Sequence, residues 1–102
     1  MMFGSLDGVK RWLPEVQGDV FDVELSALLV SASIAAEVEL SKVCDPDALP
    51  SEVKTKVDDV VEMLAAGYFR LRRQKGTPEY IDEARKRLDS LVQGLKTGVY
   101  AV

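Results

Sequence analysis

The chain has 102 residues, a net charge of −4 and 47% apolar residues, which is typical of one soluble globular domain with a single core. An acidic total argues against a general nucleic-acid binder, which would carry a basic face. One cysteine, Cys44, and no histidine exclude a disulfide scaffold and the usual zinc patterns within one chain, and they remove the commonest general base.

No membrane or secretion signal is visible. The longest mostly apolar run, from Ala27 to Val38, is interrupted by Ser31, Ser33 and Glu37. It is also shorter than the roughly 20 apolar residues that span a bilayer. The first residues lack the basic and apolar segments of a signal peptide. We therefore expect the protein to act where it is made, without a membrane.

The charge is unevenly divided along the sequence. Residues 1–62 carry five bases and thirteen acids, a net charge of −8, whereas residues 63–102 carry eight bases and four acids, a net charge of +4. Such a chain can be a solvated monomer. The division also suits repeated subunits that meet acidic side to basic side.

The first predicted element is a short helix over residues 5–13, preceded by a loose start over residues 1–4. Ser5 is a suitable N-cap, and Pro14 ends the helix. Trp12 lies in its apolar stripe, so we interpret it as a core anchor.

A long helix is predicted over residues 22–43, with Asp19 or Asp22 as its cap. Its core stripe comprises Leu25, Leu28, Leu29, Ala32, Ala36, Leu40 and Val43. A second apolar strip, Ala27, Val30, Ile34 and Val38, falls on the opposite side, with polar residues on both flanks. A helix with two apolar faces is either sandwiched inside its own fold or shared with a partner.

The central helix is predicted over residues 51–75, after a break marked by Pro46 and Pro50. It should be the spine of the fold, with a buried stripe of Val53, Val57, Val60, Leu64, Tyr68 and Leu71. Phe69 falls on the polar side, where we expect it to be exposed. The basic end of the central helix includes Arg70 and Arg73. We predict that this end, together with Phe69, contacts another subunit or a partner.

The last helix is predicted over residues 78–96, after the stop-and-start signal Gly76-Thr77-Pro78. It should pack antiparallel to the central helix through Ile81, Ala84, Leu88, Leu91 and Leu95. A short apolar tail, residues 97–102, follows and is either frayed or docked. We predict that Val99, Tyr100 and Val102 engage a neighbour. The fold class is thus all-α, one domain over residues 1–102 with one short and three long helices.

We find no arrangement of residues that indicates catalysis, a cofactor or a metal. Asp58, Asp59 and Glu62 include two carboxylates four residues apart, but such a pair without histidine or a pocket is usually a solvated face. The aspartates near Pro46 lack the glycine and glutamate of a calcium loop. We therefore expect a protein that is not an enzyme. The basic end of the central helix is compatible with transient, non-specific DNA contact as well as with acidic protein surfaces.

The order of elements resembles a known family. The segments VKRWL, DVELSALLVSASIAAEVEL, ALPSEVK, VVEMLAAGYFRLRRQ and EYIDEARKRLDSLVQGLKTGV follow one another over nearly the whole chain. This arrangement is similar to the small head-to-tail connector (adaptor, or head completion) proteins of tailed bacteriophages, including the Mu-like and gp6-like groups. Helix order and length carry the resemblance more than any single residue does.

The resemblance implies a structural protein of the virion neck, present in the host cytoplasm before assembly. Such proteins form a ring of about twelve copies beneath the portal protein, continue the DNA channel and bind the next neck or tail component. It also implies that residues 99–102 engage neighbours. The alternative is a small helical regulatory or partner-binding protein, antitoxin-like or anti-repressor-like, that pairs two-fold through the same apolar strip.

Overall fold

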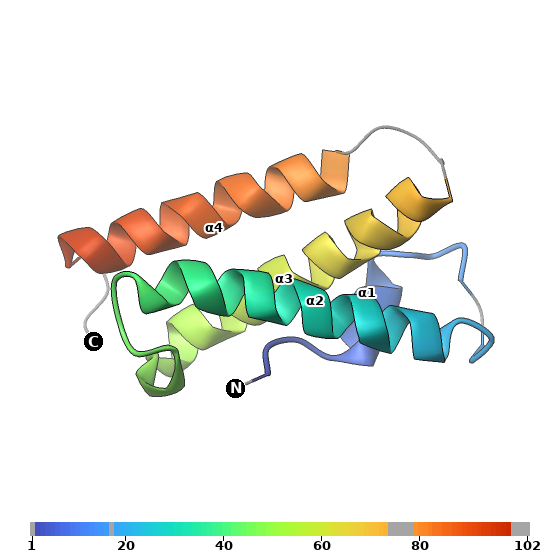
Figure 1. Cartoon of the computed structure of the whole chain (residues 1–102), viewed down its shortest axis with the longest axis horizontal. Coiled ribbons are helices and arrows are strands. Elements are labelled where there is room, and N and C mark those ends of the chain that lie inside the picture. Colours follow the sequence, from blue (N-terminus) through green and yellow to red (C-terminus); the bar gives the residue numbers. More distant parts are fainter. Residues whose placement is uncertain (1, 17, 74–78, 99–102) are drawn as a thin grey trace.

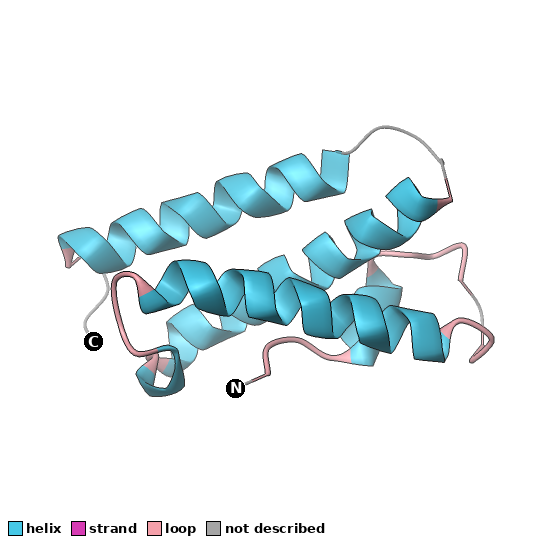
Figure 2. Cartoon of the chain, in the orientation of Figure 1, coloured by secondary structure: helices cyan, strands magenta, loops and turns pink. Residues whose placement is uncertain are grey.

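The computed structural model describes residues 2–16, 18–73 and 79–98. It contains the helices α1 (Leu6–Arg11), α2 (Asp22–Ser41), α3 (Ser51–Arg72) and α4 (Glu79–Thr97), with a single 3-10 turn, η1 (Pro46–Ala48), before α3. Figures 1 and 2 show these helices packed as a small bundle, and no strand occurs within the described residues. The predicted all-α fold is confirmed.

The central helix α3 contacts each of the other three helices, as expected of a spine. Eight consecutive residues of α3, from Val60 to Gly67, are buried, so this part of the helix is enclosed on every side. The small residues Ala65, Ala66 and Gly67 let neighbouring helices approach closely. The predicted stripe is buried as far as Leu64, but Tyr68 is half-buried and Leu71 is exposed.

Helix α4 packs along α3 through the five residues predicted for its core face. The two helices approach closely at Gly67, where a Cβ atom would lie 2.8 Å from Cγ1 and 3.0 Å from the backbone nitrogen of Ile81. Only glycine leaves room for the start of α4 at this point. The Tyr80 hydroxyl donates a hydrogen bond to the carbonyl of Trp12, and the two rings meet edge to face. Trp12 is partly buried and packs against the core, as predicted.

The first residues do not form a loose start, and that prediction is wrong from Phe3 onward. Phe3 is fully buried, and three successive backbone N–H groups donate to side chains of distant helices. The Phe3 amide binds Ser33 Oγ of α2, and the Gly4 amide binds Asp58 Oδ1 of α3, both at 2.8 Å. The Ser5 amide binds Glu62 Oε2 at the same distance. Residues 3–5 are therefore fixed across α2 and α3.

Glu62 is 4% exposed, so the expectation that it belongs to a solvated carboxylate face is also wrong. Its carboxylate accepts from the amide and hydroxyl of Ser5 and lies 3.7 Å from the Arg11 guanidinium. Gly8 lies directly against it, because a Cβ atom there would overlap the carboxylate. Ser5 also caps α1 as predicted, accepting from the Gly8 amide at 3.0 Å.

Helix α2 begins where it was predicted to begin, but its cap differs. Its N-cap is Phe21, without a side-chain hydrogen bond, and Asp22 is the first helical residue. The Asp22 carboxylate instead forms an ion pair with Lys10 of α1 at 2.6 Å. The acid predicted as a cap thus ties α2 to α1.

Candidate assembly surface

The outer face of α2 carries a continuous row of exposed apolar side chains. Val23 is 88% exposed and Ile34 55% exposed, with comparable exposure at Val30 and Val38 and an exposed Ala27 between them. Steps of three and four residues place all five on one side of the helix. At about 1.5 Å per residue the row extends for roughly 22 Å. We call these five residues the α2 strip.

The opposite face of α2 lies in the core and comprises Leu25, Leu29, Ala32, Ala36 and Leu40. In Figure 1, α2 runs along the front of the bundle, with α3 behind it. The sequence left open whether α2 is sandwiched within its own fold or presents a second apolar face. The described residues of the chain leave the strip at the surface.

Three of the strip's flanking serines, Ser26, Ser31 and Ser41, are exposed. A fourth, Ser33, is buried, and its hydroxyl accepts a hydrogen bond from the Phe3 amide. The Lys42 ammonium lies 3.2 Å from Glu39 at the end of the strip. The α2 strip is thus an apolar band with polar edges, as an interface core with a polar rim requires.

Sequence reasoning missed Val23, and also Val20, which lies just before α2 and is 81% exposed. Val23 precedes Ala27 by four residues, so the same spacing that defined the strip extends to it. The spacing alone does not decide the position of Val23, because a valine in the first turn of a helix can also pack against the edge of the core. The structure shows that Val23 points away from the core.

Phe69 does not belong to an exposed contact surface, and this prediction is wrong. Its ring is 3% exposed and meets the Phe21 ring edge to face, with centroids 5.3 Å apart. The Arg73 guanidinium carbon lies 3.9 Å from the Phe69 centroid and 4.5 Å from that of Phe21. Phe69 is therefore a core residue beneath an arginine.

The basic end of α3 is engaged within the chain. Arg73 donates two hydrogen bonds to the Glu24 carboxylate of α2, at 2.7 and 2.9 Å. The hydrogen bond and charge of Arg73 lower the pKa of Glu24, and Glu24 in turn raises the pKa of Arg73. The expectation that Arg73 faces a partner is not what the structure shows, because its guanidinium is held between a carboxylate and two rings.

Arg70 is held in the same way. Its guanidinium binds both oxygens of Glu15, at 2.9 and 3.0 Å, and lies 4.5 Å from the centroid of the Tyr80 ring. The hydrogen bond to Glu15 raises the pKa of Arg70. Both arginines predicted to contact a neighbour thus join α3 to other parts of their own chain. Val99, Tyr100 and Val102 lie outside the described residues.

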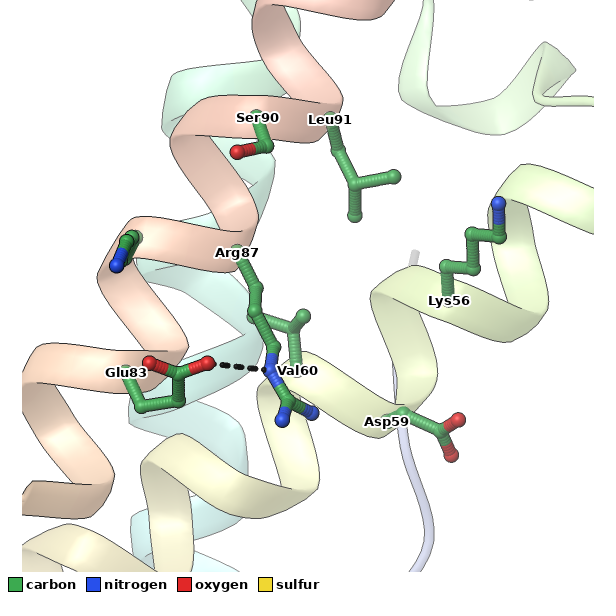
Figure 3. Close-up of a pocket in the computed structure, with 8 residues that line it drawn as sticks. Lys56, Asp59, Val60, Glu83, Arg87, Ser90 and Leu91 are labelled. Atoms are coloured by element: carbon green, nitrogen blue, oxygen red, sulfur yellow. Dashed lines mark hydrogen bonds and ion pairs between the residues drawn. The ribbon is translucent and has the colours of Figure 1, made fainter.

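A groove lies between α3 and α4 and has a volume of about 360 Å³. Val60 and Leu91 are the apolar residues of its lining, and the other six lining residues are charged or polar (Figure 3). Arg87 pairs with Glu83 at 3.0 Å on one edge. The complete lining, called the α3–α4 groove below, consists of Lys56, Asp59, Val60, Glu83, Lys86, Arg87, Ser90 and Leu91.

Other chemistry is sparse in the described part of the chain. There, no three histidine, cysteine, aspartate or glutamate side chains are grouped so as to hold a metal ion. Burial raises the pKa of the Cys44 thiol, and the charge of Asp45 adds to this effect. The described helices include none long and apolar enough to cross a membrane.

Among the described residues, the α2 strip and the α3–α4 groove are two candidate surfaces for a partner. No protein-family model, curated protein or solved structure matches this chain, so the assignment of a function depends on its own sequence and structure.

Proposed function

We propose that the chain is a structural assembly subunit, the head-to-tail connector (adaptor) of a tailed bacteriophage. In this role, copies of the chain form a ring below the portal protein, continue the DNA channel and bind the next neck component. The proposed role needs no catalysis and no cofactor. It places the protein in the host cytoplasm before assembly and in the virion neck afterwards.

The observation that carries the proposal is the α2 strip. Single exposed apolar side chains are ordinary, but a contiguous apolar row with a polar rim marks a site of association. Complete burial of a valine or isoleucine side chain contributes about 1.5–3 kcal/mol. Ile34, Val38 and Val23 are more than half exposed, so they have most of this contribution still to gain on contact. The strip by itself suggests association, and the resemblance of the helix order to connector proteins suggests which assembly it serves.

The first test is self-association, measured by sedimentation velocity over a concentration series. The wild-type chain should form larger species as concentration rises, and Ile34→Asp should remain monomeric because it places a charge in the strip. Thr55→Asp, an exposed position on α3, is the matched control and should associate like the wild type. A wild type that is monomeric throughout, or an Ile34→Asp variant that still associates, would contradict the proposal.

The second test addresses the virion. Purified particles of a phage that encodes the chain should contain it, as detected by mass spectrometry, and electron microscopy of the neck should show helical density for a ring beneath the portal. Absence of the chain from complete particles would overturn the connector role, even if the protein self-associates in solution.

A second candidate function is supported by the arrangement of the strip on one straight helix. In an antiparallel pair of α2 helices, Val23 would face Val38 of the second copy, and Ala27 would face Ile34. Such a two-fold contact suits a small dimeric regulatory or partner-binding protein of the antitoxin or anti-repressor kind. A stable dimer that forms no larger species when portal protein is added would favour this candidate.

A further inference from the structure

The N-terminal segment, residues 2–5, ends beside the α2 strip. Its backbone amides are bound in order across two helices, Ser5 and Gly4 by carboxylates of α3 and Phe3 by the Ser33 hydroxyl of α2. Followed from residue 5 back to residue 3, the segment therefore passes from α3 to α2, and Figure 1 shows it beside α2. Met2 is the next residue in this direction, so it lies at the α2 end of the segment.

Ser33 places Met2 at the edge of the strip. It follows Val30 by three residues and directly precedes Ile34, so it lies on the flank of the apolar row. The Phe3 nitrogen is 2.8 Å from the Ser33 hydroxyl oxygen, and Met2 is bonded to that nitrogen. The backbone of Met2 is therefore within about 5 Å of the hydroxyl. Phe3 is fully buried, whereas Met2 is 46% exposed, so an exposed apolar side chain adjoins the strip.

The area of the contact calls for such a neighbour. The α2 strip is one helix wide, about 10 Å, and roughly 22 Å long, so its footprint of roughly 220 Å² is below the roughly 800 Å² that each partner buries in a stable complex. Copies that associate through the strip therefore also contact the surface beside it. On one flank, Glu24, Glu39 and Lys42 are already paired within the chain. The other flank carries Met2, a flexible apolar side chain that adapts to an opposing surface.

We infer that Met2 and the α2 strip form one association surface for a second copy of the chain, and that Asp58 and Glu62 are positioning residues that hold Met2 in it. This inference rests on the proposed self-assembly. It adds to the strip a second structural element, and it makes association depend on two acids of a different helix.

The two acids act on the surface through the N-terminal segment. The Glu62 carboxylate is buried and accepts from both the amide and the hydroxyl of Ser5, whereas Asp58, one turn earlier on α3, accepts from the Gly4 amide at 2.8 Å. Removing an acceptor leaves a backbone amide without its partner, so the segment loosens and Met2 loses its fixed position beside α2. Association then loses the contribution of Met2 although the strip itself is intact.

The contribution of Met2 is tested with Met2→Ser, which removes the apolar side chain and leaves the backbone contacts of the segment in place. Burial of the exposed half of such a side chain corresponds to roughly a fivefold change in the dissociation constant, so sedimentation velocity should show association weakened by about that factor. Leu71→Ser is the matched control and should associate like the wild type. Leu71 is 52% exposed and lies two residues along α3 from the buried Phe69, so it faces the other way.

The positioning role is tested by a double-mutant cycle. Glu62→Gln should weaken association of the wild type by about the same factor as Met2→Ser does, and it should have no further effect in the Met2→Ser background, because the residue that it positions is already gone. Glu52→Gln, exposed on the same helix, is the control. Circular dichroism checks that each variant keeps the helicity of the wild type. If Glu62→Gln loses helicity, Asp58→Ala, at a half-buried position, is carried through the same cycle.

Each outcome assigns a failure to one level. If Met2→Ser associates like the wild type while Ile34→Asp is monomeric, the inference is overturned and strip-mediated assembly stands. Equal weakening by Leu71→Ser would also overturn it, because the effect would belong to any exposed apolar side chain. If the change at the acid weakens association equally in both backgrounds, the acid acts on the fold and not through Met2, and the positioning role is overturned. If Ile34→Asp also associates like the wild type, the proposed function itself fails.

Discussion

Helices α2 and α3 are similar in length, and both carry apolar residues on more than one side, but the fold treats them differently. α3 is surrounded by α1, α2, α4 and the N-terminal segment, so its buried residues extend around the whole helix. α2 is the more apolar in composition, yet only one of its faces is covered. The position of each helix in the bundle determines how much of its apolar surface is buried. Apolar surface on the central helix stabilises the fold, and the same kind of surface on a peripheral helix is left for association.

The largest effect expected from this comparison is at Phe69. Phe69→Ala should lower the free energy of unfolding by about 3–5 kcal/mol, because it removes a buried ring and leaves a cavity beneath Arg73. Urea denaturation monitored by circular dichroism measures this change. On the exposed side of α2, Val30→Ala should change the free energy by no more than about 0.5 kcal/mol. Similar losses for both variants would show that the two helices are not enclosed to different extents.

An intermediate effect is expected at Glu62, where α3 is covered by the N-terminal segment. Glu62→Gln should lower the free energy of unfolding by roughly 1–3 kcal/mol, because a neutral amide cannot accept from Ser5 and pair with Arg11 as a carboxylate does. The variant should also show faster amide hydrogen exchange at residues 3–5 than the wild type does. Glu52→Gln, at an exposed position on the same helix, serves as the control. Unchanged exchange in Glu62→Gln would mean that the segment is held by Phe3 alone.

The smallest effect is expected at the ion pair that joins α2 to the end of α3. Arg73 lowers the pKa of Glu24 in the folded state, so the folded protein binds fewer protons at this site than the unfolded chain does. The stabilisation from Glu24 is therefore complete above the ordinary carboxyl value of 4.5 and is lost as pH falls through the lower folded pKa. The contribution should be small because both side chains are partly exposed, so that solvent screens the pair.

Thermal unfolding of wild type and Glu24→Gln over a pH series measures this contribution. The difference between their melting temperatures should be greatest near neutral pH and should shrink as the solution becomes acidic. A difference that stays constant with pH would show that Glu24 acts through packing and not through its charge.

The helices and most of the core could be predicted because local periodicity determines them. The buried stripe of α4 has the spacing expected from its sequence, and the α2 strip was visible as a second row on the same helix. The sequence could not show whether α2 or α3 is the enclosed helix, because that depends on which faces meet in space. Val23 illustrates the limit, since its spacing fits the strip while its exposure is known only from the fold.

The errors at Phe69 and Glu62 share one cause. Both lie on a face of α3 whose polar residues indicate solvent, and that face is instead covered by α1, Phe21 and residues 3–5. A buried carboxylate is acceptable here only because Ser5 and Arg11 satisfy it. These partners are far away in the sequence, so no local pattern could indicate them.

The N-terminal segment also constrains the order in which the chain can fold during translation. Phe3, Gly4 and Ser5 are synthesised before their hydrogen-bond partners, which lie 30, 54 and 57 residues further along the chain. These contacts therefore cannot form until the ribosome has released residues through Glu62, and the loops that they close are long. Residues 3–5 thus wait for α2 and for most of α3 before they reach their final position.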